Sequence, residues 1–234
     1  METLDTALKL LRPNMYMASI DLTNSFYHLL VHPRHRKFLK FSCMGRKFQF
    51  TSLPMGYKDS PRLFTKLMKV PLALLWEHYG CIIICYIDDL LILGHSPSQV
   101  RSSVAYMANL LRLLVFCINF KKSELVPTTS IEFLGFVLNS VEMSITLTQA
   151  KASKIADLAR EILAQPTFSI WFLAQFLGNC VASFPAVEYG PFHTKEIEGE
   201  KTWALKQNDK NFEAPMSLPE RLRTVFVSCV LVER

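Results

Sequence analysis

The sequence predicts an α+β domain followed by a small helical region. Up to residue 138, short runs rich in β-branched and aromatic residues alternate with amphipathic stretches, and beyond Thr146 only helical periodicity remains. Half of the residues are hydrophobic and a fifth are charged, which is typical of a globular protein. With 234 residues, the chain is long enough to bury a substantial core.

Four elements are expected before the first long helix, and turn-forming residues separate them. Pro13 ends the first helix and Pro33 ends a helical turn, because proline lacks the amide proton that a helix interior requires. Gly45 lies at the centre of an alternating segment, as in a β-hairpin. The elements are a helix over 3–11, a strand over 15–22, a helical turn over 23–31 and a hairpin over 37–53.

The first long helix is predicted to begin at Asp59-Ser60-Pro61. Aspartate side chains often cap helices, and proline suits the first helical position. An apolar face follows, and Pro71 is expected to kink the helix. The residues on that face are Phe64, Leu67, Met68, Leu72 and Leu75.

Two neighbouring aspartates, Asp88 and Asp89, interrupt an apolar run. The flanking segments, 81–87 and 90–93, have the composition of buried strands, so the aspartates mark a turn between them. Two-residue hairpin turns favour Asn-Gly or Asp-Gly, because their central residues need positive φ, and Asp-Asp meets this need poorly. Adjacent carboxylates also repel each other and lose solvation beside an apolar core. The pair is therefore either a solvated turn or a functional site.

The remaining elements are strands mixed with helices, and then helices alone. The last two helices begin at a capping Thr or Ser and end near Pro166 and Gly178, which are common helix stops. Residues 185–215 are rich in proline, glycine and charge and show no clear period. The predicted elements are a helix over 98–114, strands over 115–120 and 131–138, and helices over 148–165 and 169–177.

The net charge of +6 arises at the start of the chain. The first 70 residues contain 12 Lys and Arg against 4 Asp and Glu, an excess larger than that of the whole chain. The basic residues are interleaved with phenylalanines, which suits a polyanion-binding surface, although a solvated basic face has the same composition. The phenylalanines are Phe38, Phe41, Phe48 and Phe50.

Composition excludes several classes of protein. Charged residues interrupt every apolar run before it reaches the length of a membrane span, and the acidic N-terminus, METLDTALKLLRPN, differs from a signal peptide. We expect an intracellular protein, in the cytoplasm or nucleus, that does not associate with membranes. The six cysteines lack zinc-ligand spacing and are expected to be reduced thiols. They are Cys43, Cys81, Cys85, Cys117, Cys180 and Cys229.

A third aspartate is expected to join the pair. Asp21 ends a predicted strand, and if that strand lies beside the one that ends at Asp88, the two carboxylates converge across 67 residues of sequence. Close carboxylates repel each other unless a hard cation such as Mg²⁺ binds them. Two such ions, about 3.5–4 Å apart, can activate an attacking hydroxyl and neutralise a leaving pyrophosphate.

A zinc site at His28, His32 and His35 is disfavoured, because a proline breaks their helical spacing.

Five motifs, in order, resemble those of retroelement reverse transcriptases, and the similarity covers residues 19–138. One YxDD signature is a weak signal, but five ordered motifs at the family's spacing are a strong one. Residues 15–41 most resemble the tyrosine-recombinase (DIRS-like) retrotransposons. The motifs are SIDLTNSF (19–26), TSLPMGYKDSPRLF (51–64), YIDD (86–89), NFKKS (119–123) and FLGF (133–136).

The resemblance implies a fold and an activity. A polymerase palm, with an antiparallel sheet packed on helices, would occupy 1–145, a helical thumb 146–184, and a connection remnant and tail 185–234. The family's fingers would be largely absent, and no ribonuclease H domain is expected beyond about residue 205. The activity would be RNA-directed DNA polymerisation, in which dNTPs are added to a primer 3′-hydroxyl on an RNA or DNA template. Two Mg²⁺ ions, or Mn²⁺ in their place, would assist.

The resemblance also assigns roles to individual residues. The catalytic metal ligands would be Asp21, Asp88 and Asp89. The nucleotide-binding residues would be Phe26, Met55, Gly56 and Lys122. The nucleic-acid-binding residues would be Lys58, Arg62, Leu134 and Gly135.

Several of these roles have a specific chemistry. Phe26 would clash with a ribose 2′-hydroxyl and so select dNTPs, and Lys122 would help to protonate the leaving group. Met55 replaces a glutamine that contacts the sugar in retroviral relatives, so this contact must differ. Leu134 and Gly135 would place the primer end, although FLG is also compatible with plain strand.

Two other functions remain open. The chain is also compatible with a truncated, catalytically inactive remnant that at most binds nucleic acid through its basic surface. An RNA-directed RNA polymerase is disfavoured by Phe26 and by YIDD in place of a Gly-Asp-Asp signature.

Overall fold

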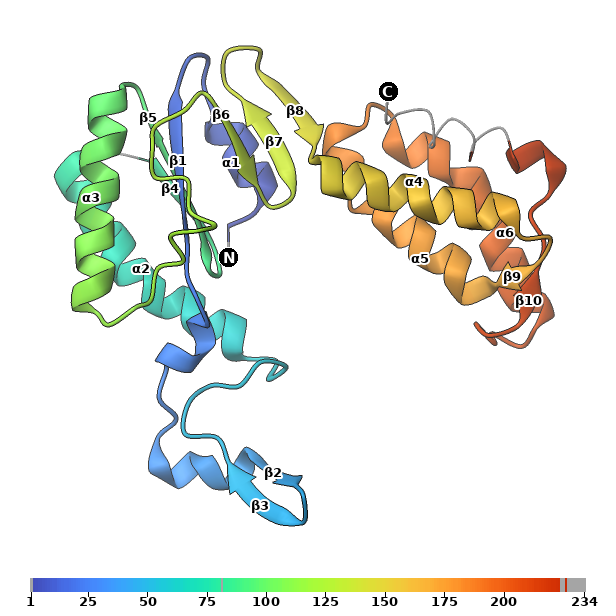
Figure 1. Ribbon diagram of the computed structural model, residues 1–234, viewed down its shortest axis with the longest axis horizontal. Coiled ribbons are helices and arrows are strands. Elements are labelled where there is room, and N and C mark those ends of the chain that lie inside the picture. The colour runs from blue at the N-terminus through green and yellow to red at the C-terminus, as the bar shows by residue number, and fades with distance from the viewer. Residues whose placement is uncertain (1, 81, 224–225, 227–234) are drawn as a thin grey trace. The chain divides into compact units, whose positions relative to one another are not determined.

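The computed structural model describes residues 2–80, 82–223 and 226, which form two compact units (Figure 1). The first unit comprises residues up to 134 together with 138–144, and the second comprises 135–137 and the residues from 145 onward. Cys81, Cys229 and most of the predicted tail at 225–234 lie outside the described residues.

A three-stranded antiparallel sheet with the order β1-β5-β4 is the centre of the first unit. The central strand, β5, pairs with a neighbour on each side, and its residues Leu90 to Leu93 are completely buried. The strands predicted around the aspartate pair are confirmed, but β5 already begins at Asp89. The strands are β1 (Tyr16–Asp21), β4 (Ile82–Tyr86) and β5 (Asp89–Gly94).

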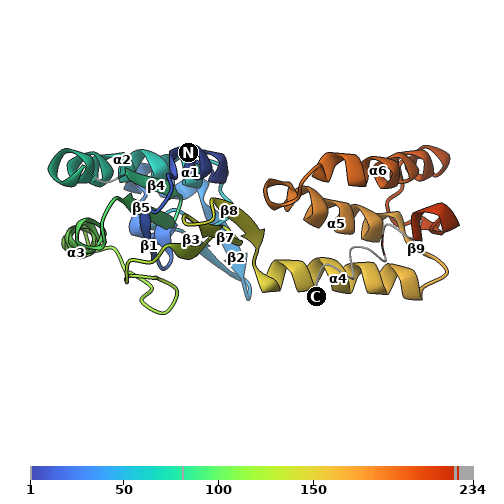
Figure 2. The same ribbon diagram turned by 90° about the horizontal axis from the view of Figure 1, so that it is seen from above.

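Two helices, α2 (Ser60–Tyr79) and α3 (Pro97–Leu113), pack against each other and cover one face of this sheet (Figure 2). Successive side chains of a strand point to opposite faces. Even-numbered residues of β1 and β5, such as Ala18, Ile20 and Ile92, share one core with the helices. The odd-numbered Asp21 and Asp89 therefore belong to the face away from α2 and α3.

The helix α2 begins where predicted, but the side chain of Asp59 does not cap it. The Asp59 carboxylate instead accepts hydrogen bonds from the Tyr57 hydroxyl and from Arg62 Nε, each at 3.2 Å. The helix continues through Pro71, and Leu67 on the predicted apolar face is 42% exposed. The buried members of that face are Phe64, Met68 and Leu75.

A short helix, α1 (Leu4–Leu10), lies against the edge strand β4. Just before it, the carboxylate of Glu2 accepts a hydrogen bond from the backbone N–H of Cys85 at 2.6 Å. Burial and the nearby charge of Glu2 raise the pKa of the Cys85 thiol to about 12, so this cysteine stays protonated. The described cysteines are free thiols: Cys43, Cys85, Cys117 and Cys180.

The other edge of β1 is covered by an irregular segment, residues 117–128. Backbone hydrogen bonds at intervals along the strand connect this segment to β1, such as those that join Met17 to Thr128 at 2.7 and 2.9 Å. The strand predicted over 115–120 is wrong, because only Ile118 forms a bridge, with Leu22. A turn at Asn119 interrupts the contacts with β1: the backbone N–H groups of Lys122 and Ser123 both donate to the Asn119 carbonyl.

Between β1 and α2, the chain forms two 3₁₀ helices and the predicted hairpin, which projects away from the central sheet (Figure 1). Met44 and Gly45 form the hairpin turn with φ values of 49° and 72°, as a two-residue turn requires. Pro33 begins the second 3₁₀ helix. The elements are η1 (Ser25–His28), η2 (Pro33–Phe38), β2 (Lys40–Cys43) and β3 (Arg46–Gln49).

A second three-stranded sheet has the order β6-β7-β8. The single strand predicted over 131–138 is wrong, because Leu134 and Gly135 form a turn with φ values of 51° and 77°. FLGF is therefore the tip of a hairpin. The strands are β6 (Ser130–Phe133), β7 (Phe136–Asn139) and β8 (Ser144–Leu147).

Three helices make up most of the second unit, and α5 lies between α4 and α6 (Figure 2). Their shared core includes Ile162, Phe176 and Ile197. The helices are α4 (Gln149–Ala164), α5 (Ile170–Val181) and α6 (Gly190–Gln207). The shorter elements are β9 (Phe168–Ser169), η3 (Phe184–Ala186) and β10 (Pro215–Met216).

The helix boundaries in this unit were only partly predicted. Ser169 caps α5, and its hydroxyl accepts a hydrogen bond from the backbone N–H of Phe172 at 3.3 Å. The predicted end at Gly178 is wrong, because α5 continues to Val181. The helix α6, which begins at Gly190-Pro191, lies in the segment where no period was found.

Candidate active site at the β4–β5 turn

Asp21 and Asp89 face each other across neighbouring antiparallel strands. The register of β1 and β5 pairs Asp21 with Asp89, and the register of β4 and β5 pairs Tyr86 with Asp89. Ile87 and Asp88 are therefore the turn residues, and the Asp88 carbonyl accepts a hydrogen bond from the backbone N–H of Leu22 at 3.0 Å. The three aspartates thus meet at one corner of the sheet, with Asp89 on a strand and Asp88 in the turn.

The turn places a β-branched residue in an unfavourable conformation. Ile87 has φ of 57°, in the left-handed region that favours glycine or asparagine. Ile87 packs against the buried core, which holds it there. Strained backbone of this kind is frequent where a site requires a particular geometry.

Two residues that were not predicted hold Asp21 in place. The backbone N–H of Asp21 donates to the Ser123 hydroxyl at 3.0 Å, and the Asp21 carbonyl accepts from the Asn119 N–H at 2.9 Å. The Ser123 hydroxyl donates in turn to the Asn119 carbonyl at 2.8 Å. The NFKKS motif contains both residues, but only the structure shows that this motif lies against the end of β1.

The carboxylates disfavour each other's charge. Burial, with the charges of Asp88 and Asp21 and a hydrogen bond to Asp21, raises the pKa of Asp89 to about 6. Burial, and then the charge of Asp21, raises the pKa of Asp88. The positive charge of Lys122 lowers the pKa of both groups, although its side chain is exposed. A bound cation would therefore stabilise the ionised carboxylates at this corner.

The donor set suits a hard divalent cation, because all three groups are carboxylates and the opposed pair needs neutralising. Among the described residues, no three acidic, histidine or cysteine side chains are already gathered around one point. Asp21 and Asp89 are a close pair whose side chains are hydrogen-bonded, and Asp88 lies in the adjoining turn.

Phe26 lies in η1, five residues beyond Asp21, and is partly buried. Its ring packs edge-on against the buried Phe64, with centroids 5.9 Å apart. The ring therefore contributes to the core and also reaches the surface.

The second predicted motif forms the turn that leads into α2. Met55 is 61% exposed, and Gly56 has φ of 84° with no atom near its would-be Cβ, so backbone conformation alone requires glycine there. Lys58 and Arg62 are exposed, and Arg62 pairs with Asp59. Leu134 and Gly135 are the two turn residues between β6 and β7.

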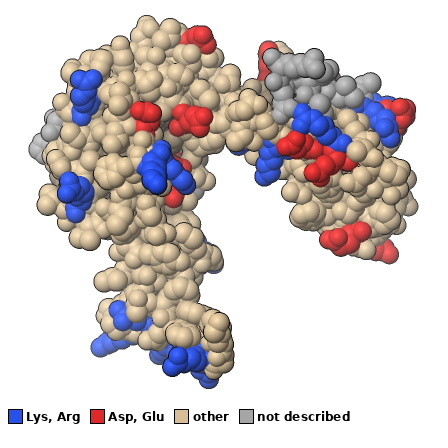
Figure 3. Space-filling view, viewed as in Figure 1, with Lys and Arg blue, Asp and Glu red and all other residues tan. Residues whose placement is uncertain are grey.

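Basic side chains gather over the β2–β3 hairpin (Figure 3). Phe41 and Phe48 stack on this hairpin with centroids 5.5 Å apart, and Lys37 lies 5.1 Å above the ring of Phe38. The hairpin thus combines exposed aromatic rings with positive charge. Its basic residues, with those of the adjoining η2, are Arg34, Arg36, Lys37, Lys40, Arg46 and Lys47.

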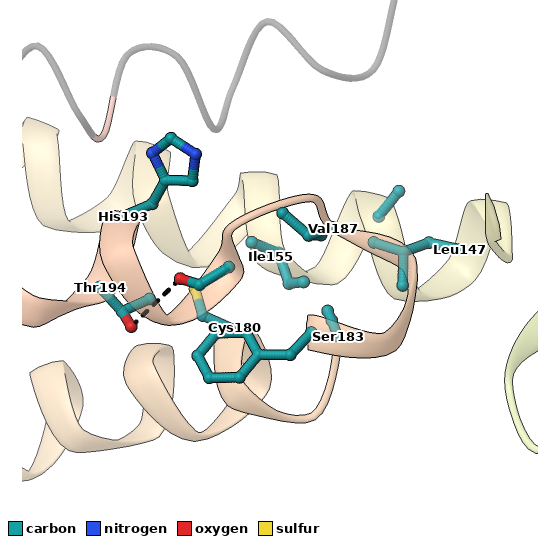
Figure 4. Close-up of a pocket in the computed structure, with 10 residues that line it drawn as sticks. Leu147, Ile155, Cys180, Ser183, Val187, His193 and Thr194 are labelled. Carbon is teal, nitrogen blue, oxygen red and sulfur yellow. Dashed lines mark hydrogen bonds between the residues drawn. The ribbon is translucent and has the colours of Figure 1, made fainter. Parts of the chain in front are cut away.

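A separate cavity of about 170 Å³ lies within the second unit (Figure 4). The hydroxyls at its wall are turned to backbone: Ser183 donates to the Asn179 carbonyl at 2.9 Å, and Thr194 to the Gly190 carbonyl at 3.4 Å. Its lining is otherwise almost entirely apolar and includes no carboxylate. This cavity therefore offers no carboxylate ligand for a hard cation such as Mg²⁺.

Among the helices described, none is long and apolar enough to cross a bilayer.

Comparison with known proteins places the three aspartates within a family domain. Residues 2–138, more than half of the chain, match the sequence profile described as "Reverse transcriptase (RNA-dependent DNA polymerase)". The matched range also contains Ser123, Asn119 and the β6–β7 turn.

Curated relatives share this part of the chain. A retrovirus-related Pol polyprotein from the transposon opus of Drosophila melanogaster is 25% identical over 163 residues, which is 70% of this chain and 15% of the relative. Protein P of duck hepatitis B virus (strain China) is 30% identical over 145 residues, or 61% of this chain and 18% of the relative. The chain thus spans less than a fifth of the length of these relatives.

Solved structures share the fold. A foamy viral protease-reverse transcriptase in complex with RNA/DNA hybrid matches 96% of this chain with a TM-score of 0.72 and 22% identity, over 28% of its own length. The same viral protein in complex with double-stranded DNA matches 96% of this chain with a TM-score of 0.71 and 21% identity, over 36% of its own length.

Proposed function

Because the chain belongs to the reverse transcriptase (RNA-dependent DNA polymerase) family, we propose that it catalyses RNA-directed DNA synthesis at the β4–β5 turn. The observation that supports this most directly is the opposition of Asp21 and Asp89, with Asp88 in the adjoining turn. Three acidic groups at one corner of a sheet lower the stability of the fold unless they bind cations.

We propose that Asp21, Asp88 and Asp89 hold two Mg²⁺ ions, for which Mn²⁺ is a substitute. The ions, when bound, would supply activation of the primer hydroxyl and neutralisation of the pyrophosphate charge. Asp88, in the adjoining turn, would supply the third carboxylate. Ser123 and Asn119 would keep Asp21 in place through their backbone contacts.

The reaction would be an in-line displacement at the α-phosphate of a dNTP. The primer 3′-oxygen would form the new bond to phosphorus and pass its proton to solvent water, and the bond between the α-phosphorus and the pyrophosphate oxygen would break. Lys122, whose charge acts on both Asp88 and Asp89, would donate a proton to the leaving pyrophosphate. Its exposed ammonium group forms no ion pair with a carboxylate among the described residues.

Substrate contacts would come from the neighbouring segments. Phe26 would restrict the space at the sugar to that of a deoxynucleotide, and its packing against Phe64 would keep the ring rigid. Met55 and Gly56 would contact the incoming nucleotide, where the absence of a Cβ permits close approach. Lys58 and Arg62 would contact the template, and the Leu134–Gly135 turn the primer end.

We propose that the macromolecular partner is an RNA or DNA template-primer. The foamy viral proteins with this fold are described in complex with RNA/DNA hybrid and double-stranded DNA, which supports the proposal. The basic β2–β3 hairpin supports it independently, since exposed Lys and Arg side chains neutralise phosphates. Within the family, the amino-acid sequence of residues 15–41 favours an origin in a tyrosine-recombinase (DIRS-like) retrotransposon.

Primer extension on an RNA template tests the proposal. With dNTPs and Mg²⁺, the protein is expected to lengthen a DNA primer, and Asp88→Ala is expected to abolish extension. Glu142→Ala, at an exposed carboxylate outside the corner, is the control and should extend normally. Template binding without extension in the unsubstituted protein would contradict the proposal and favour an inactive nucleic-acid-binding remnant.

A further inference from the structure

Hydrogen bonds connect the turn between β6 and β7 to the start of α4. Thr148 is the N-cap residue of α4, but its hydroxyl makes no cap hydrogen bond. The backbone N–H and the hydroxyl of Thr148 both donate to the Gly135 carbonyl, each at 3.4 Å. A side chain that would ordinarily stabilise its own helix is therefore used to hold the neighbouring turn.

Lys151, in the first turn of α4, makes a second connection to the same turn. Its ammonium nitrogen lies 3.7 Å from the centroid of the Phe136 ring, the residue that follows Gly135. The same nitrogen donates to the Ala182 carbonyl, after α5, at 3.4 Å. A cation this close to a ring face is attracted by the ring's negative quadrupole, and the attraction grows when water is excluded.

The side chain of Lys151 passes close to the Cα of Gly135. A Cβ added at Gly135 would lie 3.0 Å from Lys151 Cε, 3.2 Å from Cδ and 3.3 Å from Nζ. At the equivalent turn position of the β2–β3 hairpin, Gly45 has a similar φ, but a Cβ there would meet nothing within 4 Å. Gly135 therefore allows both the left-handed turn and the close passage of the lysine stem.

We propose that Lys151 is a positioning residue that holds the Leu134–Gly135 turn in register with α4. Burial lowers the pKa of Lys151, but the group keeps two partners for its charge, the Phe136 ring and the Ala182 carbonyl. This inference rests on the proposed function where it assigns the turn to the primer end: a shift of α4 would then move the primer 3′-hydroxyl.

A lysine that instead binds phosphate directly makes different predictions. Such a contact adds to affinity and to the salt dependence of binding, by about one unit in the slope of log K against log salt concentration. A positioning residue changes how the bound primer end is used. Binding and turnover therefore distinguish the two roles.

The experiment compares Lys151→Met with Lys154→Met in primer extension and in template-primer binding. Methionine keeps the apolar stem and removes the charge, and Lys154 is exposed on the same helix. Lys151→Met is expected to lower kcat by roughly 10- to 100-fold, as small displacements of reacting atoms do, with Kd and its salt slope unchanged. Lys154→Met should leave all three quantities unchanged.

Two further variants test the contact between Lys151 and the turn. Lys151→Arg, which retains a charge over the ring, is expected to recover part of kcat, and Gly135→Ala should reproduce the loss that Lys151→Met causes. The inference is overturned if Lys151→Met has the kcat of the unsubstituted protein, or if it reduces the salt slope by about one.

A readout without turnover separates this inference from the proposed function. In NMR spectra of the full chain, Lys151→Met should shift the Leu134 methyl and Gly135 amide signals, and Lys154→Met should not. If these signals move while no variant extends a primer, the proposed function fails and the positioning of the turn stands. If they do not move, the positioning role is wrong.

Discussion

Asp21 on β1 lies directly opposite Asp89 on β5, with Asp88 in the adjoining turn. Like charges directly opposite each other on antiparallel strands are destabilising. Burial, and then the charge of the neighbouring aspartates, raises the pKa of both Asp89 and Asp88. The protein therefore tolerates an unfavourable arrangement at this corner, and neighbouring residues, Ser123 and Asn119, hold it in place.

Replacing Asp89 with asparagine is expected to stabilise the metal-free protein at neutral pH. The folded protein binds the Asp89 proton more tightly than the unfolded chain does, because the pKa rises from 3.8 to about 6 on folding. Stability therefore falls as the pH rises from about 4 to about 6 and stays lower above that range. Asp89→Asn removes this loss, which solvent screening limits to about 1 kcal/mol.

Thermal unfolding in EDTA at pH 4 and pH 7.5 measures the effect. Asp89→Asn should raise Tm by a few degrees at pH 7.5 and by much less at pH 4. Asp209→Asn, at an exposed carboxylate of the second unit, serves as the control. An equal Tm for Asp89→Asn and the unsubstituted protein at pH 7.5 would show that the repulsion has no energetic effect.

Ser123→Ala is expected to loosen the end of β1. The substitution removes the hydroxyl that accepts the Asp21 N–H and donates to the Asn119 carbonyl, each bond contributing about 1 kcal/mol. Hydrogen exchange at the Asp21 amide should accelerate by roughly fivefold, because its acceptor is removed. Ser102→Ala, at an exposed position of α3, is the control. Unchanged exchange at Asp21 would mean that this bond does not hold the strand.

The β2–β3 hairpin is expected to supply part of the nucleic-acid affinity. Combined alanine substitution of Lys40, Arg46 and Lys47, all exposed, should weaken template-primer binding. The slope of log K against log salt concentration should fall by about 0.9 for each phosphate that the variant no longer neutralises. The matched control replaces three exposed lysines of the second unit: Lys195, Lys206 and Lys210. Equal slopes for the two triple variants would rule out a specific role for the hairpin.

Local sequence patterns predicted the central sheet and much of its surroundings. The strands around Asp88 and the hairpin around Gly45 are short, apolar or alternating, and bounded by residues suited to turns, so local chemistry decides them. The convergence of Asp21 with the aspartate pair was predicted from the wrong strand pairing. The strand that ends at Asp21 was expected beside the strand that ends at Asp88, which is β4, but β1 pairs with β5 and Asp21 lies opposite Asp89. Strand order and register decide this pairing, and no local pattern contains them.

The wrong predictions of secondary structure also have physical causes that local sequence patterns do not contain. Residues 115–120 have strand composition, but the turn at Asn119 interrupts their pairing with β1. The turn at Leu134–Gly135 is marked by one glycine inside an apolar run, and its first residue is a leucine with positive φ. Gly178 does not end α5, since a glycine within a helix costs only about 1 kcal/mol, which packing can offset. The roles of Ser123 and Lys151 arise from contacts between distant segments.

Manganese binding tests the central claim most directly. A titration of the metal-free protein with Mn²⁺, followed by the decrease of the free-ion EPR signal, counts bound ions without requiring activity. We expect binding by the unsubstituted protein, loss of binding in Asp21→Asn and Asp88→Asn, and unchanged binding in Asp209→Asn. Binding that persists unchanged in both corner variants would show that these carboxylates do not hold the metal.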